Sequence, residues 1–297
     1  MGNSPDEVKA IADDITETND ADGLKQALEK HIFKFTERIL RDGHIHSHYC
    51  PHGTSDAFEL YVNRALDLEL EEITFTEHMP LPGEFMEPEF LKTCSPNLDK
   101  IEQYIKELEY IKLKYKDELK INTGFEVDYI EGYEEETKKL LNKFGEKLED
   151  SILSVHFVKF EDVYYCVDYS KEGFGKLIEA VGSVEKVYNL YYETLLKAIK
   201  ADLGIYKPKR IGHPTLVRIF NLEFPLEYTN FKLLEKIVKE IKERNYEVDF
   251  NTAGIRKPYC KEIYPTGIFA DLVKLHAVKV VYGSDAHNAL DVGKNFA

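Results

Sequence analysis

The chain has 297 residues, and 43% of them are hydrophobic, so it can bury a sizeable core. Its 39 basic and 54 acidic side chains leave a formal charge of −15, which argues against a nucleic-acid-binding protein because such proteins need a basic patch. The four cysteines form no CxxC pair, which excludes a thiolate zinc finger, and no disulfide framework is expected. No secretory signal and no apolar run of the roughly 20 residues that a membrane span needs is visible. We therefore expect a cytoplasmic protein that binds small molecules and neither nucleic acid nor membranes.

The first 40 residues differ in character from the rest. Residues 1–22 are polar and acidic, whereas residues 23–40 carry apolar side chains at helical spacing from Leu24 to Ile39. This spacing predicts an amphipathic helix. We therefore divide the chain into an N-terminal extension, 1–40, and a second domain, 41–297.

From residue 41 onward, short β-like segments alternate with longer helical patterns. The predicted strands are Gly43–His48, Ile73–His78, Ile121–Asp128, Ile152–Phe157, Arg210–His213, Tyr246–Asn251 and Val278–Asp285. The predicted helices are Asp56–Leu70, Leu98–Leu119, Glu131–Phe144, Lys186–Asp202 and Phe231–Arg244. This alternation predicts a parallel sheet, either doubly wound or closed into a barrel. We expect the Pro- and Glu-rich residues 80–96 to form a long loop over the mouth and residues 158–170 to form a second excursion.

Almost every predicted strand ends in a side chain that can bind a metal ion. His44 and His46 lie two residues apart, so on a strand both point to one face, and Asp285 and His287 repeat that spacing. The other candidates are His52, His78, Glu126, His156 and His213. A lone histidine is more often a satisfied polar residue than a ligand, but so many at strand ends are hard to obtain by chance. They converge only if the carboxyl ends of the strands share one mouth, which favours a barrel over an open sheet.

Three further histidines and one aspartate need an assignment. His48 continues the alternation of the first strand and competes with His52 for a ligand role, whereas His31 and His276 are expected to be structural. Asp128 is predicted to orient a ligand histidine from behind, which metal sites usually need.

The motifs DGHIHSHYCPH, TFTEH, GFEVDY, LSVHF, RIGH and GSDAH, in this order, resemble the PHP (polymerase and histidinol phosphatase) family, and within it the monofunctional histidinol-phosphate phosphatases. The resemblance covers residues 41 to about 297. It implies an α/β fold, a distorted (β/α)7 TIM-like barrel, here with an extra N-terminal helix. It also implies a site for three divalent metal ions and favours His52 over His48 as a ligand.

The resemblance also distributes the ligands among these ions. The first ion would take His44, His46, Glu126 and Asp285. The second would share Glu126 and add His156 and His213. The third would take His52, His78 and His287. Imidazole and carboxylate ligands without a thiolate suit Zn²⁺, Mn²⁺ or Fe²⁺, and the sequence does not choose among them.

The implied activity is hydrolysis of L-histidinol phosphate to L-histidinol and phosphate, a step of histidine biosynthesis. The ions would give the site a local positive charge that favours a phosphate dianion although the whole chain is acidic. We expect a metal-bridging hydroxide to attack phosphorus in line, with Glu126, Asp285 and His287 as catalytic residues. Asp285 or His287 would pass a proton to the departing alkoxide.

Other parts of the substrate and other functions stay open. Arg218, Arg256 and Lys257 are candidates for phosphate binding, although a solvated surface charge is the commoner explanation for each of them. Glu84, Glu87 and Glu89 are candidates for the cationic end, and a solubilising loop explains them equally well. The alternative enzyme is a PHP-type phosphoesterase acting on nucleotides or other small phosphate monoesters. The third reading is a metal-binding module without activity. The oligomeric state is not predicted.

Two features depart from the family pattern. About 40 residues precede the first strand, and the chain stops ten residues after His287, before a closing helix. We expect the helix at 23–40 to take the place of that closing helix beside the first strand. The alternative is a truncated or rearranged chain.

Overall fold

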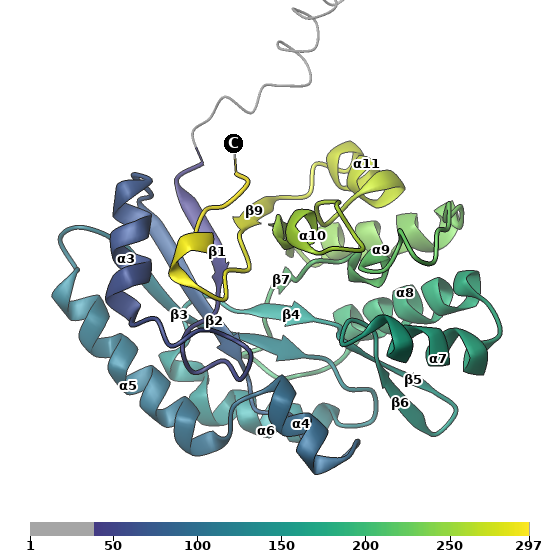
Figure 1. The fold of residues 1–297 in the computed structure, drawn as a ribbon, viewed down its shortest axis with the longest axis horizontal. Helices are drawn as coiled ribbons and strands as arrows, with labels where there is room; N and C mark the ends of the chain where they lie inside the picture. The colour runs from purple at the N-terminus through teal and green to yellow at the C-terminus, as the bar shows by residue number, and fades with distance from the viewer. Residues whose placement is uncertain (1–38, 297) are drawn as a thin grey trace, which may run out of the picture. The chain divides into compact units, whose positions relative to one another are not determined.

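The protein was analysed as a computed structural model, which describes residues 39–296 (Figure 1). Its main sheet has 7 strands in the order β1-β2-β3-β4-β7-β8-β9, and every neighbouring pair is parallel. The strands are β1 (Arg41–Ile45), β2 (Glu72–His78), β3 (Lys120–Asp128), β4 (Ile152–Ser154), β7 (Arg210–Ile211), β8 (Glu247–Asn251) and β9 (Val280–Gly283). Each predicted strand has a counterpart, although several end earlier than predicted, so that their last polar residues lie in the loops that follow.

The sheet nearly closes into a barrel where β9 comes beside β1, as Figure 1 shows for the yellow and purple ends of the described chain. Ile45 and Ala286 form a parallel bridge. The backbone N–H of His46 donates to the carbonyl of Ala286 at 2.8 Å, and that of Asp285 donates to the carbonyl of His44 at 2.8 Å. The predicted distorted seven-stranded barrel is confirmed, and these two hydrogen bonds place its seam directly at the mouth.

Five helices match the predicted ones. They are α3 (Phe58–Asp67), α5 (Leu98–Lys114), α6 (Glu134–Phe144), α8 (Val184–Lys200) and α9 (Phe231–Glu243). In α9, for example, Leu234, Ile237, Val238 and Ile241 recur at helical spacing and are buried. The helix begins after Asn230, whose side chain accepts a hydrogen bond from the backbone N–H of Leu233. Each of these helices therefore forms because a periodic apolar face can bury itself against the sheet.

Four helices were not predicted: α4 (Pro88–Cys94), α7 (Lys171–Val181), α10 (Ala253–Arg256) and α11 (Gly267–Leu275). The expectation of an uninterrupted loop over 80–96 was wrong, because Pro88 stands in the first turn of α4, where a missing backbone N–H has no cost. The predicted excursion over 158–170 contains most of an antiparallel hairpin of β5 (Phe157–Phe160) and β6 (Val163–Cys166). Short 3-10 turns occupy η2 (Gly145–Lys147), η3 (Leu216–Arg218) and η4 (Ala289–Asp291).

A buried arginine fills the inside of the barrel on the amino-terminal side of the mouth. Arg210 is 1% exposed, donates from Nη2 to the carbonyl of Gly43 at 2.6 Å and pairs with Asp150 at 2.9 Å. A Cβ on Gly43 would lie 2.7 Å from Arg210 Nη1 and 2.6 Å from Val281 Cγ1. Glycine is therefore required here because the guanidinium and β9 both pack against the backbone of β1.

The amphipathic helix predicted over 23–40, and its expected place beside the first strand, lie outside the described residues except for residues 39 and 40. These two are not helical. Within 39–296, no helix is both long enough and apolar enough to cross a lipid bilayer.

Candidate metal centre

A cavity of about 780 Å³ opens at the carboxyl ends of the strands. The predicted ligands that line it are His52, His78, Glu126, His156, His213, Asp285 and His287. His44 and His46 lie beneath this surface and are fully buried. The barrel therefore brings together all the predicted ligand side chains, from both ends of the described chain.

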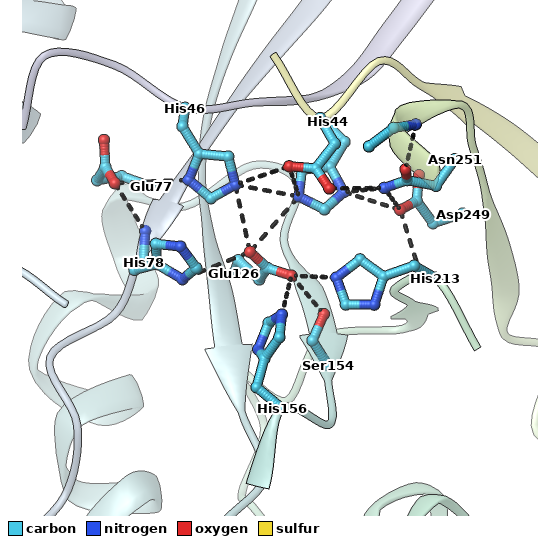
Figure 2. A network of polar contacts seen from close by, with 12 residues as sticks. His44, His46, Glu77, His78, Glu126, Ser154, His156, His213, Asp249 and Asn251 are labelled. Carbon is cyan, nitrogen blue, oxygen red and sulfur yellow. Dashed lines mark hydrogen bonds and ion pairs between the residues drawn. The ribbon is translucent and has the colours of Figure 1, made fainter. Parts of the chain in front are cut away.

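The first group of donor atoms surrounds His44 and His46. Their Nε2 atoms lie 3.2 Å apart, a contact between imidazoles that a shared ligand would explain (Figure 2). Glu126 Oε2 is 3.5 Å from His44 Nε2 and 3.2 Å from His46 Nε2. Asp285 Oδ1 is 3.7 Å and 3.5 Å from the same two nitrogens. These four side chains are the set predicted for the first ion.

The second group shares Glu126, whose other carboxylate oxygen faces the opposite way (Figure 2). Glu126 Oε1 is 2.9 Å from His213 Nε2 and 3.6 Å from His156 Nε2. One ligand atom from each of these three residues lies within 4.8 Å of the others. Glu126 thus presents one oxygen to each group, so its carboxylate could bridge two ions.

The third group differs from the predicted set, because it contains His46 and Cys50 and lacks His52. One ligand atom each from His46, Cys50, His78 and His287 lies within 4.8 Å of the others, and His52 is not part of that set. His52 is more exposed, with its ring centroid 5.2 Å from that of His78 and 4.9 Å from that of His287. Its competitor His48 turns away, with Nε2 3.4 Å from Glu107. The preference for His52 over His48 agrees with this placement.

Hydrogen bonds from a second layer of residues orient the ligand histidines. Asp249 accepts from Nδ1 of His44 at 2.8 Å, which leaves Nε2 of that ring free to face the site. Asn251 Nδ2 donates to Asp249 at 3.0 Å and to Asp285 at 3.2 Å. Asp128 Oδ1 lies 2.7 Å from His156 Nδ1, as predicted. Asp249 and Asn251 were not predicted, although their spacing of two residues at the end of a strand is the same signal that singled out His44 and His46.

Two further contacts fix the carboxylates. Ser154 Oγ donates to Glu126 Oε1 at 2.7 Å. Glu77, fully buried, accepts from the hydroxyl of Ser47 at 2.6 Å and from its backbone N–H at 3.0 Å. Glu77 precedes His78 and holds the loop after β1, so it positions the site without belonging to any of the three groups.

Asp285 does not lie on a strand, which corrects the prediction that Asp285 and His287 repeat the strand geometry of His44 and His46. β9 ends at Gly283, and Asp285 adopts a left-handed backbone conformation with φ of 52°. Aspartate tolerates this conformation better than most residues. The turn aims the carboxylate back across the seam at His44 and His46.

Opposite charges shift the pKa values of the central groups. Burial lowers the pKa of His44, but the charges of Asp285, Asp249 and Glu126 outweigh it and raise that pKa to about 10. Burial raises the pKa of Glu126, but the neighbouring His44 and His156 hold it well below the usual range. Without a metal, the site therefore holds protons on imidazoles between ionised carboxylates.

The unpartnered donor atoms test whether divalent ions suit this site. Several buried imidazole nitrogens have no hydrogen-bond partner in the described residues: both of His78, Nδ1 of His46, Nδ1 of His213 and Nε2 of His287. Buried polar groups without a partner are rare and need an explanation. Imidazoles and carboxylates that converge in three groups fit divalent ions of the zinc, manganese or iron type.

The residues predicted to bind the substrate divide into two sets. Arg256 and Lys257 line the cavity, and Arg256 Nη2 also donates to the carbonyl of Ser284 at 2.6 Å. Arg218 is not brought to the cavity, because its guanidinium makes two hydrogen bonds with Glu262 at 2.6 and 2.8 Å. The loop carboxylates Glu84, Glu87 and Glu89 do not line the cavity either.

Comparisons with known proteins agree with this architecture. The PHP domain family matches residues 42–253. Over 255 residues the chain is 44% identical to the histidinol-phosphatase of Bacillus subtilis, a match that covers 85% of this chain and 95% of that protein. A crystal structure from Listeria monocytogenes, assigned to a histidinol phosphatase, gives a TM-score of 0.82 at 37% identity over 86% of this chain and 98% of that one. The histidinol phosphate phosphatase of Lactococcus lactis, solved with zinc, L-histidinol and phosphate, shows the same fold with a TM-score of 0.60 at 20% identity over 86% and 90% of the two chains. The family match spans most of the barrel, and the chain belongs to the PHP domain family.

Proposed function

We propose that this protein is a histidinol-phosphatase, a phosphoric monoester hydrolase that converts L-histidinol phosphate to L-histidinol and phosphate in cytoplasmic histidine biosynthesis. The observation that carries the proposal is the convergence of three groups of ligand atoms on one cavity, with Glu126 between two of them. The relative from Bacillus subtilis, which is 44% identical over nearly its whole length, supports the same activity.

We infer that the site holds three divalent ions. His44, His46, Glu126 and Asp285 would bind the first, Glu126, His156 and His213 the second, and His52, His78 and His287 the third. When bound, such ions neutralise phosphate oxygens and lower the pKa of water enough to supply a nucleophile at neutral pH. The chain's own residues would hold these ions at the three groups of ligand atoms.

The residues around the cavity suit a small substrate with one phosphate and one cationic end. Arg256 and Lys257 line one part of the wall and can approach phosphate oxygens. Asp168 also lines the cavity, and its carboxylate favours an ammonium group over additional phosphates, whereas Asp128 and Asp291 already pair with His156 and Arg256. This arrangement favours histidinol phosphate over nucleotides, which are the alternative substrates.

Asp285 and His287 are placed to handle the proton that the leaving alkoxide needs. Both line the cavity, and the two residues lie within 3.5 Å of each other through Oδ1 and Nδ1. Burial and the neighbouring His46 lower the pKa of His287 from its usual value. A lowered pKa favours the neutral imidazole, which is the form that binds a metal ion.

A phosphatase assay tests the proposal directly. Purified protein loaded with Zn²⁺ or Mn²⁺ is incubated with L-histidinol phosphate, a nucleoside monophosphate and a simple alkyl phosphate, and released phosphate is measured. We expect histidinol phosphate to be hydrolysed with the highest kcat/KM. Preference for the nucleotide would favour the alternative phosphoesterase, and no release from any ester by a fully metal-loaded protein would favour a metal-binding module.

Lys257→Ala, a change on an exposed side chain, should raise the KM for histidinol phosphate with little effect on stability.

A further inference from the structure

We propose that Cys50 supplies a thiolate ligand to the ion held by His78 and His287, so that one of the proposed metal positions is a mixed sulfur and nitrogen site. This inference rests on the metal centre proposed above and adds a residue to it. The resemblance of the motifs to the PHP family assigned only imidazole and carboxylate ligands.

The position of the thiol is the first observation. Cys50 is 4% exposed, and one ligand atom each from Cys50, His46, His78 and His287 lies within 4.8 Å of the other three. The other three cysteines are not in any such group among the described residues. Cys50 therefore lies among imidazoles rather than among the apolar side chains where a buried structural cysteine is usually found.

The imidazoles around Cys50 are the second, independent observation. Nε2 of His78, which is 6% exposed, has no hydrogen-bond partner in the described residues. Nδ1 of His78 and Nδ1 of the fully buried His46 also lack one, and each faces a carboxylate oxygen at a longer distance, 3.4 Å from Glu126 and 3.6 Å from Glu77. Nε2 of His287 is also unpartnered. Buried imidazole nitrogens without a hydrogen-bond partner, gathered around a buried thiol, need an explanation, and a bound cation would supply one.

The loop that carries Cys50 is wound so that the sulfur faces inward. The backbone N–H of Cys50 donates to the carbonyl of Ser47 at 3.1 Å, and the N–H of Gly53 donates to the carbonyl of Cys50 at 3.1 Å. A Cβ on Gly53 would lie 2.9 Å from the carbonyl oxygen of Ser47, so the turn is too tight for a larger residue. The N–H of Thr54 donates to the carbonyl of His287 at 3.0 Å, which ties this loop to the other side of the same site.

Charge is the reason that a thiolate suits this position better than the others. Glu126 and Asp285 provide carboxylates to the first two groups, whereas the ligands proposed for the third, His52, His78 and His287, are all neutral when they bind a metal. A thiolate from Cys50 supplies the missing negative charge and completes a set of four ligands, the number that zinc prefers. Sulfur also selects for zinc and against harder ions such as manganese. This position should therefore prefer Zn²⁺ more strongly than the two that contain carboxylates.

Cobalt substitution tests the proposal with a spectroscopic readout. Metal-stripped protein is reconstituted with Co²⁺, and the near-ultraviolet band that arises from charge transfer between a thiolate and cobalt is recorded. We expect the band in the wild type and its loss in Cys50→Ser. Cys166→Ser is the matched control, since Cys166 lines the same cavity outside the donor groups, and it should keep the band. Cys50→Ser should also retain about one Zn²⁺ per chain fewer than the wild type after dialysis.

Two outcomes would overturn the proposal: a cobalt-loaded wild type without the band, or a band that persists in Cys50→Ser. X-ray absorption of the zinc-loaded wild type gives a second measurement that does not depend on the folding of a variant, and zinc without a sulfur neighbour would also overturn it. The phosphatase assay separates this proposal from the proposed function. Hydrolysis of histidinol phosphate without a sulfur ligand would remove only the role of Cys50, whereas a sulfur ligand without hydrolysis would remove only the function.

Discussion

A single histidine shows how the site is built. His44 is fully buried at the end of β1, and its two ring nitrogens have different tasks. Nδ1 bonds to Asp249 at 2.8 Å, and Nε2 faces Glu126 and Asp285 at 3.5 and 3.7 Å. The carboxylate behind the ring fixes the tautomer and makes the facing nitrogen more basic. In the metal-free protein that basicity binds a proton instead of an ion.

The raised pKa of His44 predicts how the stability of the metal-stripped protein depends on pH. Its pKa is about 10 in the folded chain, raised by Asp285, Asp249 and Glu126 against the effect of burial, and about 6.5 in an unfolded one. A raised pKa contributes stability that is fully present below pH 6.5 and is lost as the pH rises toward 10. We expect the melting temperature of chelator-treated wild type to fall across this interval more steeply than that of His44→Gln. Parallel curves for the two proteins would contradict this.

Asp285 gives a prediction about the leaving group. If its carboxyl passes a proton to the departing alkoxide, Asp285→Asn should lower kcat by roughly 10²- to 10⁴-fold for histidinol phosphate. The loss should be smaller for p-nitrophenyl phosphate, because p-nitrophenolate leaves without needing a proton. Metal content is measured in parallel, since Asp285 lies near both His44 and His46. Equal losses on the two esters would instead assign Asp285 to metal binding alone.

At the level of elements, the seam between β1 and β9 brings the two ends of the described chain into one site. Asp42, fully buried in β1, accepts hydrogen bonds from the backbone N–H groups of Ser284 and Gly293, both at 2.9 Å. One carboxylate thus holds both the end of β9 and the segment after His287. The segment that follows β9 is tied to β1 by hydrogen bonds from its backbone to the Asp42 side chain, and its short η4 turn contacts α3.

This bonding predicts the effect of Asp42→Asn. The amide keeps the shape of the carboxylate but replaces one acceptor with a donor, which would face the N–H of either Ser284 or Gly293. An unpaired buried donor costs about 1–3 kcal/mol, so we expect that loss of stability in chemical denaturation. Because the seam holds Asp285, metal retention should weaken as well. Asp117→Asn, a change on the exposed surface, is the control and should leave stability and metal retention unchanged.

The sequence alone predicts the elements whose signal is local and fails where the signal lies in distant partners. The strands and the five long helices follow from apolar periodicity, and the candidate ligands follow from histidines repeated at strand ends. The left-handed turn at Asp285 depends on closure against β1, which no local pattern shows. Arg218 has the chemistry of a phosphate ligand, but Glu262, far away in sequence, takes its guanidinium. Cys50 was discounted because no CxxC pair exists, although its neighbours in the fold are histidines.

At the level of the whole molecule, the proposed ligands come from strand ends or the loops after them around almost the entire barrel, from β1 to the turn after β9. Ions bound to them would link β1, β2, β3, β4, β7 and the segment after β9 through one centre. Without ions, a proton on His44 offsets part of the carboxylate charge, but it does not link the strands to one another. Metal binding should therefore stabilise the fold as well as provide the chemistry.

Metal removal tests this coupling. A ligand that binds only the folded chain stabilises it by about 2.7 kcal/mol when its free concentration is 100 times its Kd. For a chain of this size, each kcal/mol shifts the melting temperature by roughly 2–4 °C, so chelation should lower it by roughly 5–10 °C per tightly bound ion. Added Zn²⁺ or Mn²⁺ should restore it in a concentration-dependent way, whereas Mg²⁺, which prefers oxygen ligands, should do so poorly. His213→Ala should reduce the recovery, while Lys257→Ala should preserve it. If neither chelation nor added zinc changes the melting temperature, the side chains around Glu126 do not form a metal site.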